Sequence, residues 1–368
     1  MQGRNEILEI VELIEKTTKR NQVVVNEIKK TPLRKKENPY NKEEMIIEKI
    51  IPLSSNNLNI AGVDSGFCSK ALNFGSITII KEVGVIFSYK DNKLSGTKYF
   101  PQAYNLAKPY LTTSALEIEE VLYNTSILRL NKELSLSSEI FGQSKNKEAK
   151  KDLDFLLLDG SIIPQYITRP GKESKLYDDY NYLLNKFFSL YDLAREKKIF
   201  LVGVIEDCRA DRFFNFINNE LIIEKKVDNI IYDSNLISSL LDKGERTGIM
   251  LYSQKAKDHP ILRDFPEDIT KNLYVVYLKL SDFDYPLRLE FIYFPEYGLS
   301  LKEYTEKIVS TLSLVSSHNK QYVYPAPLVE ADIRSRLKEN EIERIMTNIF
   351  ERTKIFGLRG QRREGRMF

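Results

Sequence analysis

The chain has 368 residues and a net charge of +3, and it is 42% hydrophobic and 29% charged, as expected of a globular protein with a substantial core. Two Cys and two His are too few for a zinc finger, a disulfide framework or a polyhistidine metal site, and the near-neutral charge excludes a histone-like binder. A divalent metal would have to be bound by carboxylates, which favours Mn²⁺ or Mg²⁺ over Zn²⁺.

The N-terminal region is predicted to be a helical arm with a basic linker, covering residues 1–57. Apolar side chains recur at helical spacing over residues 4–30: Ile7, Ile10, Val11 and Ile14. Residues 29–36 (KKTPLRKK) form a basic segment that Pro32 separates from the helix. The first 20 residues are charged throughout, and no apolar segment is long enough to span a membrane, so we predict a cytoplasmic protein.

The middle of the chain is predicted to alternate strands and helices. We expect a strand from residue 58 to Asp64 and two or three hairpin strands over residues 74–100, with turns at Lys81-Glu82 and Lys90-Asp91-Asn92. There follow a helix over residues 112–141, a polar insertion over residues 142–152, a buried strand at 155–158, a helix at 177–197 and a second buried strand at 199–205. This order predicts an α/β fold with a ribonuclease H-like mixed sheet flanked by helices.

The last third adds helices and one pair of strands. Residues 212–260 are predicted to be mostly helical, the segments 274–280 and 287–294 to pair as strands, and residues 300–317 to be helical. A final helix is expected to begin near Asp332. Residues 58–345 are predicted to form one mixed domain, followed by a basic tail over residues 346–368.

Two aspartates are predicted to meet at one edge of the sheet. Asp64 and Asp159 each end an apolar strand and stand before Ser65-Gly66 or Gly160-Ser161. Ligands of α/β sheets bind at the carboxyl ends of the strands, whereas a single Asp-Gly is more often a turn. A divalent cation would relieve the repulsion between the two carboxylates, and phosphodiester hydrolysis uses two such ions about 4 Å apart.

Further carboxylates are expected from two helices. Glu133 lies four residues after Arg129, so that both share one face of the 112–141 helix. The alternatives on this helix are glutamates at other positions: Glu139, Glu120 and Glu119. Asp332 is the fourth candidate, and its alternative role is a favourable charge in the first turn of a helix.

Five motifs in order along residues 58–340 resemble the NurA family of archaeal and bacterial nucleases. They are Gly62-Val-Asp64-Ser-Gly66, Leu157-Leu-Asp159-Gly-Ser161, Gly203-Val-Ile-Glu-Asp-Cys-Arg209, Gly244-Glu-Arg246-Thr and Tyr324-Pro-x-Pro-Leu-x-x-Ala-Asp332. The resemblance implies a ribonuclease H-like fold, a homodimer and a manganese-dependent nuclease with both 5′–3′ exonuclease and endonuclease activity on single-stranded DNA. It also implies a role in resecting double-strand-break ends with a HerA-type hexameric helicase.

By this resemblance, Asp64 and Asp159 match the metal-binding aspartates and Glu133 the intervening glutamate. The chain departs from the family pattern at two positions, because Glu206 stands where many members have Lys and Asp332 where His is frequent. The number of residues between Glu133 and Asp159 is also large, owing to the insertion at 142–152.

Other residues are candidates for DNA contact. Arg209 and Arg246 lie in motif loops where they could clamp phosphates, and Tyr324 could stack on a base. Salt bridges and core packing are the alternative roles of these three residues. Two other functions remain open: an actin-like or sugar-kinase-type ATPase, for which no late Gly-Gly motif is found, and a non-catalytic paralogue serving a translocase complex.

Overall fold

The structure is a computed structural model. It describes residues 2–30, 43, 47–52, 57–72, 75–113, 116–142, 153–206, 208–220 and 231–353. Most of the predicted basic linker, nearly all of the 142–152 insertion, Asp207 and the tail from residue 354 lie outside these residues. All seven candidate site residues lie among the described residues.

The contacts of the chain divide it into two compact units. Unit 1 comprises residues 1–53, 204–256 and 266–324, and unit 2 comprises residues 54–203, 257–265 and 325–368. Strand β7, Phe200–Ile205, passes from unit 2 into unit 1 after Gly203. All four candidate carboxylates belong to unit 2, so the candidate site can be described within that unit.

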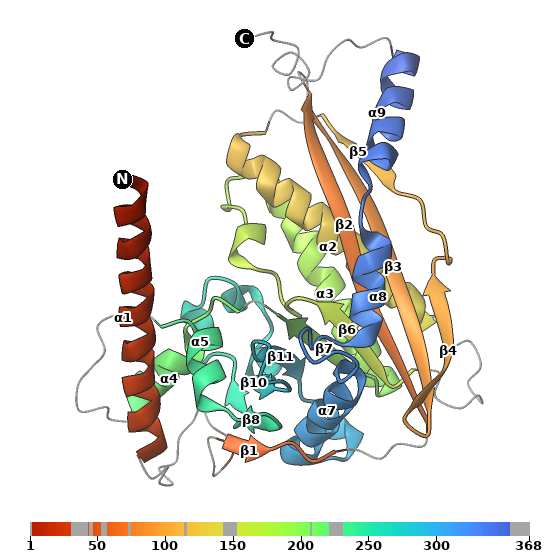
Figure 1. The fold of residues 1–368 in the computed structure, drawn as a ribbon. Helices are drawn as coiled ribbons and strands as arrows, with labels where there is room; N and C mark the ends of the chain where they lie inside the picture. Colours follow the sequence, from red (N-terminus) through yellow and green to blue (C-terminus); the bar gives the residue numbers. More distant parts are fainter. Residues whose placement is uncertain are drawn as a thin grey trace. The chain divides into compact units, whose positions relative to one another are not determined.

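Unit 2 is built on a mixed sheet with the strand order β7-β6-β2-β3-β4, and β5 also pairs with β3 (Figure 1). Its other strands are β2 (Asn57–Leu72), β3 (Gly75–Lys90), β4 (Lys93–Phe100), β5 (Lys108–Thr112) and β6 (Phe155–Asp159). β6 runs parallel to β2, while β3 is antiparallel to β2, β4 and β5. The predicted mixed α/β architecture is confirmed, with mostly antiparallel pairing.

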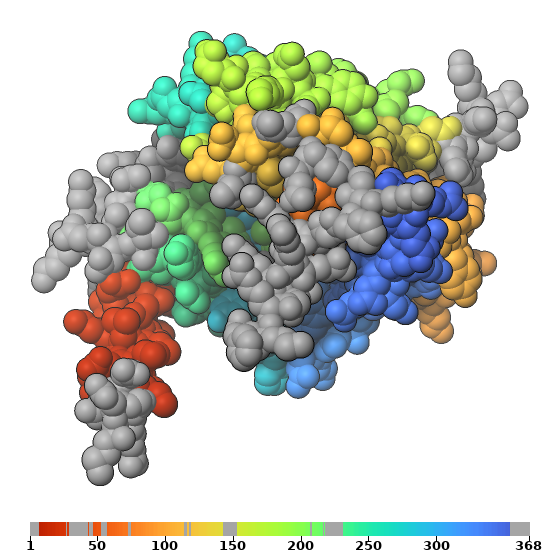
Figure 2. Space-filling view, turned by 90° about the horizontal axis from the view of Figure 1, so that it is seen from above, coloured from red at the N-terminus to blue at the C-terminus, as the bar shows by residue number. Residues whose placement is uncertain are grey.

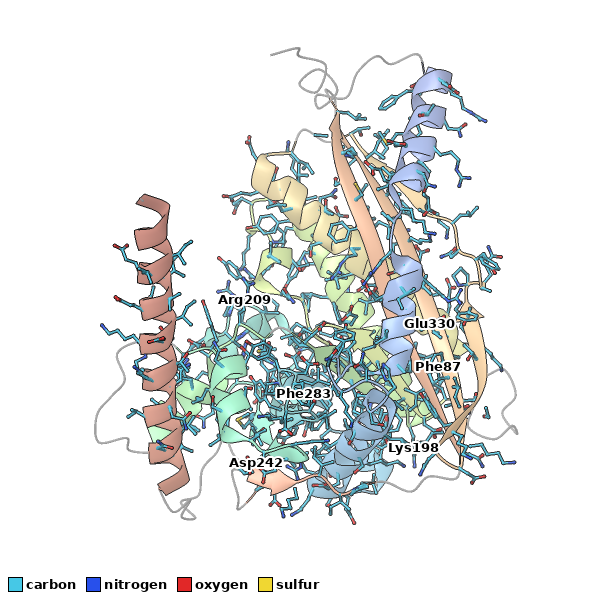
Figure 3. All side chains as sticks on the ribbon, viewed as in Figure 1. Phe87, Lys198, Arg209, Asp242, Phe283 and Glu330 are labelled. Carbon is cyan, nitrogen blue, oxygen red and sulfur yellow. The ribbon has the colours of Figure 1, made fainter. Side chains whose placement is uncertain are left out.

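Helices cover both faces of this sheet (Figure 1). They are α2 (Ile118–Gly142), α3 (Tyr177–Lys197), α8 (Ala326–Ser335) and α9 (Glu339–Thr353), with 3-10 turns at Tyr166–Thr168 and Leu262–Asp264. A Cβ on Gly84 would meet Ile140 of α2, whereas the neighbouring Val83 and Val85 pack against Ala331 of α8. Because successive side chains of a strand point to opposite faces, α2 and α8 lie on opposite sides of β3. Figure 2 shows α3 in yellow-green at the surface of unit 2, and Figure 3 shows Glu330 on α8 and Phe87 on β3.

Two glycines of β2 allow the backbone of α8 to lie directly on the strand. A Cβ on Gly62 would come within 2.6 Å of the carbonyl carbon of Pro327, and one on Gly66 within 2.2 Å of the carbonyl oxygen of Ser335. These approaches are tolerable only without a side chain. The glycines that flank Asp64 therefore set where α8 crosses the sheet.

Gly66→Ala is expected to lower the free energy of unfolding by about 1–3 kcal/mol, because α8 must move away from β2 to make room for the methyl group. Gly171→Ala is the matched control, because nothing lies within 4 Å of the Cβ that it would add. Urea denaturation of both variants measures the difference. Equal midpoints for the two variants would contradict the close approach.

Unit 1 combines a small sheet with helices. Its strands follow the order β1-β8-β10-β11, and β9 also pairs with β10: β1 (Ile47–Lys49), β8 (Glu245–Thr247), β9 (Met250–Leu251), β10 (Leu273–Lys279) and β11 (Leu287–Ile292). Its helices are α1 (Gln2–Lys30), α4 (Arg212–Glu220), α5 (Asp233–Leu240), α6 (Glu267–Lys271) and α7 (Leu301–Ser316), with a 3-10 turn at Pro295–Tyr297; a further 3-10 turn, Ala256–Asp258, lies at the boundary with unit 2. The predicted strand pair and the predicted helix at 300–317 are confirmed.

The two ends of α1 differ in burial. Val24, Val25 and Ile28 are buried in the core of unit 1, whereas the apolar stripe predicted from Ile7 to Ile14 is exposed. None of the described helices combines the length and the apolar character that a membrane-spanning helix needs.

Three predicted features of secondary structure before residue 261 are wrong. β2 continues through Asp64 to Leu72, because residues 65–72 go on pairing with β3. Lys81-Glu82 is no turn, because both residues lie within β3 and pair with β2. Their side chains form ion pairs with Glu341 and Lys108. The region 212–260 is only partly helical, since β8 and β9 lie within it.

Candidate active site

Asp64 and Asp159 lie side by side where the parallel pairing of β2 and β6 ends. The last paired residues are Val63 and Leu158, each directly before one of the aspartates. Beyond this point β6 stops, while β2 continues with β3 alone on its other side. Asp64 is buried and Asp159 partly exposed. The predicted convergence of these residues on one edge is thus present, although Asp64 lies within a strand rather than at its end.

Glu133 of α2 approaches the same edge and is 7% exposed. Ser65 donates a hydrogen bond from Oγ to Glu133 Oε1 at 2.5 Å, and Arg129 Nη1 lies 3.7 Å from the same oxygen. Burial raises the pKa of Glu133 to about 7; Arg129 and Ser65 oppose this shift, while the negative charges of Asp64 and Asp159 add to it. Glu133 thus lies near enough to both aspartates for their charges to affect its pKa.

Of the four glutamates considered on this helix, Glu133 is the one buried beside the aspartates. Glu119 and Glu139 are exposed, and Glu120 accepts a hydrogen bond from Ser174 Oγ at 2.8 Å. This hydrogen bond is the largest cause that lowers the pKa of Glu120, whereas burial raises the pKa of Glu133. This comparison favours Glu133 as the helix-borne member of the site.

Asp64 is held from the opposite face of the sheet. Ser335, at the end of α8, is 1% exposed and donates a hydrogen bond from Oγ to Asp64 Oδ2 at 2.7 Å. Asp64 and Ser65 point to opposite faces because they are successive strand residues, so the two serines hold their carboxylates from two sides. Ser335 reaches Asp64 only because Gly66 lets the carbonyl end of α8 approach β2.

Ser335→Ala is expected to weaken the binding of Mn²⁺ at this edge about 10- to 100-fold, the effect that is typical when a group that orients a metal ligand is removed. The hydroxyl fixes one orientation of the Asp64 carboxylate, and alanine leaves it free to rotate. Ser310→Ala serves as the control, because it removes another buried hydroxyl, one that donates to the Ile51 carbonyl in unit 1. Calorimetric titration with Mn²⁺ measures the affinity of both variants, and an equal loss in the two would contradict the prediction.

Hard oxygen donors are the chemistry that this edge offers. Asp64, Glu133 and Asp159 supply carboxylates, the ligands that Mn²⁺ and Mg²⁺ prefer. Burial is the main cause of the raised pKa of Glu133, and the charges of Asp64 and Asp159 add to it, a repulsion that a cation would relieve. Among the described residues no group of three or more His, Cys, Asp or Glu side chains is arranged to hold a metal ion. Asp64 and Glu133 instead accept hydrogen bonds from Ser335 and Ser65. The donor set fits a divalent metal, whose binding would require these side chains to turn toward it.

Asp332 lies in the last turn of α8, not in the first turn of a final helix as predicted. Its Oδ2 accepts a hydrogen bond from Arg336 Nη2 at 2.6 Å, and its side chain is 39% exposed. Its main-chain carbonyl accepts a weaker bond from Ser335 Oγ at 3.1 Å. Asp332 is thus linked to Asp64 through Ser335, while its carboxylate pairs with arginine.

All three predicted DNA contacts belong to unit 1, and two of them are buried there. Arg246 is in β8, fully buried, with Glu43 and Glu306 as ion-pair partners. Tyr324 is 3% exposed and donates its hydroxyl to the Val204 carbonyl at 3.0 Å. These placements correspond to the structural alternatives, because neither side chain presents a surface to a phosphate or a base. Arg209 is exposed. It is labelled in Figure 3.

Sequence reasoning missed the two hydroxyls that hold the carboxylates. Ser65 stands inside the quoted Asp64-Ser65-Gly66 motif, so strand alternation could have indicated its opposite face. Ser335 carries no comparable signal, because its contact with Asp64 joins residues 271 positions apart. The place where a helix crosses a strand is set by tertiary packing and cannot be predicted from a local pattern.

A scan against protein-family models matches residues 58–337 to the NurA domain. The chain belongs to the NurA family. Crystal structures agree with this assignment at the level of fold: the NurA nuclease from Sulfolobus solfataricus is 17% identical with a TM-score of 0.57, over 94% of each chain. A second NurA structure is 10% identical with a TM-score of 0.50, over 95% of this chain and 98% of the other.

A third NurA structure, described as bound to dAMP and manganese, is 11% identical with a TM-score of 0.48, over 92% of this chain and 94% of the other. No protein in a curated collection matches the sequence. Family membership removes the actin-like ATPase from consideration.

In this NurA-family chain, Glu206 accepts a hydrogen bond from the Tyr322 hydroxyl at 3.3 Å, so the departure from Lys is accommodated by a neutral partner.

Proposed function

We propose that this chain is a divalent-metal-dependent deoxyribonuclease that hydrolyses phosphodiester bonds. The observation that carries the proposal is the approach of Asp64, Asp159 and Glu133, from β2, β6 and α2, to one edge of the sheet in a NurA-family chain. Three neighbouring carboxylates without His or Cys match the hard-metal chemistry of phosphodiester hydrolysis. The same arrangement, with β6 parallel to β2 in an otherwise antiparallel sheet, supports a ribonuclease H-like fold.

Each residue has a distinct role in the proposal. Asp64, Glu133 and Asp159 would hold Mn²⁺ or Mg²⁺, as two ions in a complete site, and Asp332 is proposed as a fourth carboxylate. The metal would supply Lewis acidity at the phosphate. Ser335 orients Asp64 and Ser65 orients Glu133, and burial of Glu133 keeps bulk water away from one side of the site. Below pH 7, Glu133 would hold a proton and bind a cation less well.

Family resemblance supports the finer assignments. We propose that the enzyme cuts single-stranded DNA both internally and from 5′ ends, acts on duplex ends during double-strand-break repair, works with a HerA-type helicase and forms a homodimer. Arg209 is proposed to contact a DNA phosphate, since its guanidinium is exposed at the start of the segment that precedes α4. A cytoplasmic location remains part of the proposal.

Incubation of end-labelled DNA with the purified protein tests the activity. Linear and circular single strands and duplexes are each combined with Mn²⁺, with Mg²⁺ and with EDTA. Cleavage that requires a metal supports the proposal, and cutting of circles separates endonuclease from exonuclease action. Absence of cleavage on every substrate with both metals would overturn it and favour the non-catalytic paralogue.

A further inference from the structure

A largely apolar cavity of about 570 Å³ lies in unit 2 directly beside the carboxylates. Glu133 and Asp159 are among the residues that line it, so the cavity is continuous with the candidate site. Its apolar wall is formed by Phe67 of β2, Leu122 of α2 and Ile167 of the 3-10 turn that precedes α3. A cavity of this size lies within the range that small-molecule ligands occupy in proteins.

The apolar wall is unusually accessible. Phe67 is 48% exposed, Leu122 54% and Ile167 51%, although large apolar side chains within a folded unit are usually buried. Together they form a partly exposed apolar surface that lines the cavity. Such a surface beside a polar centre is characteristic of a ligand site.

Arg129 joins this wall to the carboxylates. Its guanidinium carbon lies 5.6 Å from the centre of the Phe67 ring, and its Nη1 lies 3.7 Å from Glu133 Oε1. A molecule that reached from the carboxylates to the Phe67 ring would therefore pass Arg129. A nucleotide has this form, with a phosphate at one end and a flat, apolar-faced base at the other.

We propose that this cavity binds one unstacked nucleobase of the DNA strand, next to the phosphate that is cut, with Phe67 as the stacking surface. The inference rests on the proposed nuclease function and deepens it. Every base presents a π-face, so stacking on Phe67 tolerates any sequence. A base inside a duplex cannot enter without unpairing and unstacking, which makes the cavity a physical reason for preferring single strands and frayed ends.

A binding assay without metal isolates this contribution. Fluorescence anisotropy in EDTA measures the affinity for oligothymidine and for an abasic oligonucleotide, which keeps the phosphates but lacks the bases. We expect Phe67→Ala to weaken oligothymidine binding at least about fivefold and to leave abasic binding unchanged, because stacking of one base contributes at least that much. Phe67→Tyr should restore binding, since it keeps the ring.

Tyr104→Ala is the matched control, because Tyr104 is 86% exposed in unit 2 and does not line the cavity. It should leave both affinities unchanged. Equal oligothymidine binding by wild type and Phe67→Ala would overturn the proposal, as would an equal loss on both oligonucleotides. Thermal melting shows whether Phe67→Ala is folded, and if it is not, Phe67→Leu, which keeps an apolar side chain but no ring, replaces it with the same expectations.

Cleavage distinguishes failure of this inference from failure of the proposed function. A single abasic nucleotide is moved stepwise along a single strand, and single-turnover cutting is mapped with Mn²⁺. We expect the rate of cutting to decrease at the phosphate next to the abasic position. Uniform cutting would overturn the base site and leave the nuclease standing, whereas base-dependent binding without any cutting would overturn only the nuclease.

Discussion

Asp64→Asn is expected to lower the rate of metal-dependent DNA cleavage by more than about a hundredfold, since even the removal of groups that merely orient a metal ligand costs 10- to 100-fold. The substitution keeps the shape of the side chain and an oxygen that can accept the Ser335 hydrogen bond. It removes the negative charge that the metal requires. Single-turnover cleavage of labelled single-stranded DNA measures the effect.

Asp242→Asn provides the matched control, because it makes the same chemical change at an exposed position of unit 1, labelled in Figure 3. Its activity should equal that of the wild type. Asp332→Asn separates the fourth candidate from the other three: a loss as large as that of Asp64→Asn would make Asp332 a ligand. Full activity of Asp64→Asn would refute the assignment of the site.

Glu133→Gln is expected to stabilise the metal-free protein above pH 7, by about 3 kcal/mol. The pKa of Glu133 rises from about 4.5 to about 7 on folding, so the folded protein binds this proton more tightly than the unfolded chain. Stability from this group is therefore complete below pH 4.5, falls as the pH rises to about 7 and is lost above it. The amide oxygen of glutamine can still accept the hydrogen bond from Ser65, and the amide carries no charge.

Urea unfolding of both proteins across this pH range, in EDTA and in Mn²⁺, checks the prediction. The wild type should lose stability between pH 4.5 and 7 in EDTA more steeply than the variant. Mn²⁺ should stabilise the wild type above pH 7, because a ligand that binds only the folded state shifts unfolding by mass action. The same stabilisation of Glu133→Gln by Mn²⁺ would show that Glu133 binds no metal.

Local patterns predicted the elements whose character is set by neighbouring residues. The uninterrupted apolar runs at 155–158 and 199–205 indicated buried strands, and the periodicity of 177–197 and 300–317 indicated helices. Asp64 and Asp159 followed from the same runs, because a charged residue after a buried strand marks the edge of a sheet. For these elements the sequence and the fold agree.

Features that depend on distant partners were predicted poorly. Asp64-Ser65-Gly66 looks like a turn, yet β3 continues to pair with this segment. Arg246 looked available to DNA because Glu43 and Glu306 are 203 and 60 residues away in sequence. Buried ion pairs of this kind require a fold before they can be recognised, and the same holds for the cavity beside Phe67.

The contact between Asp64 and Ser335 also has a consequence for the timing of protein synthesis. A ribosome adds about 5–20 residues per second, so 271 residues separate the two partners by roughly 15 to 50 s. Until α8 emerges, the nascent chain carries Asp64 and Asp159 without the hydroxyl that holds Asp64. The proposed metal site therefore gains the contact that orients Asp64 only near the end of translation.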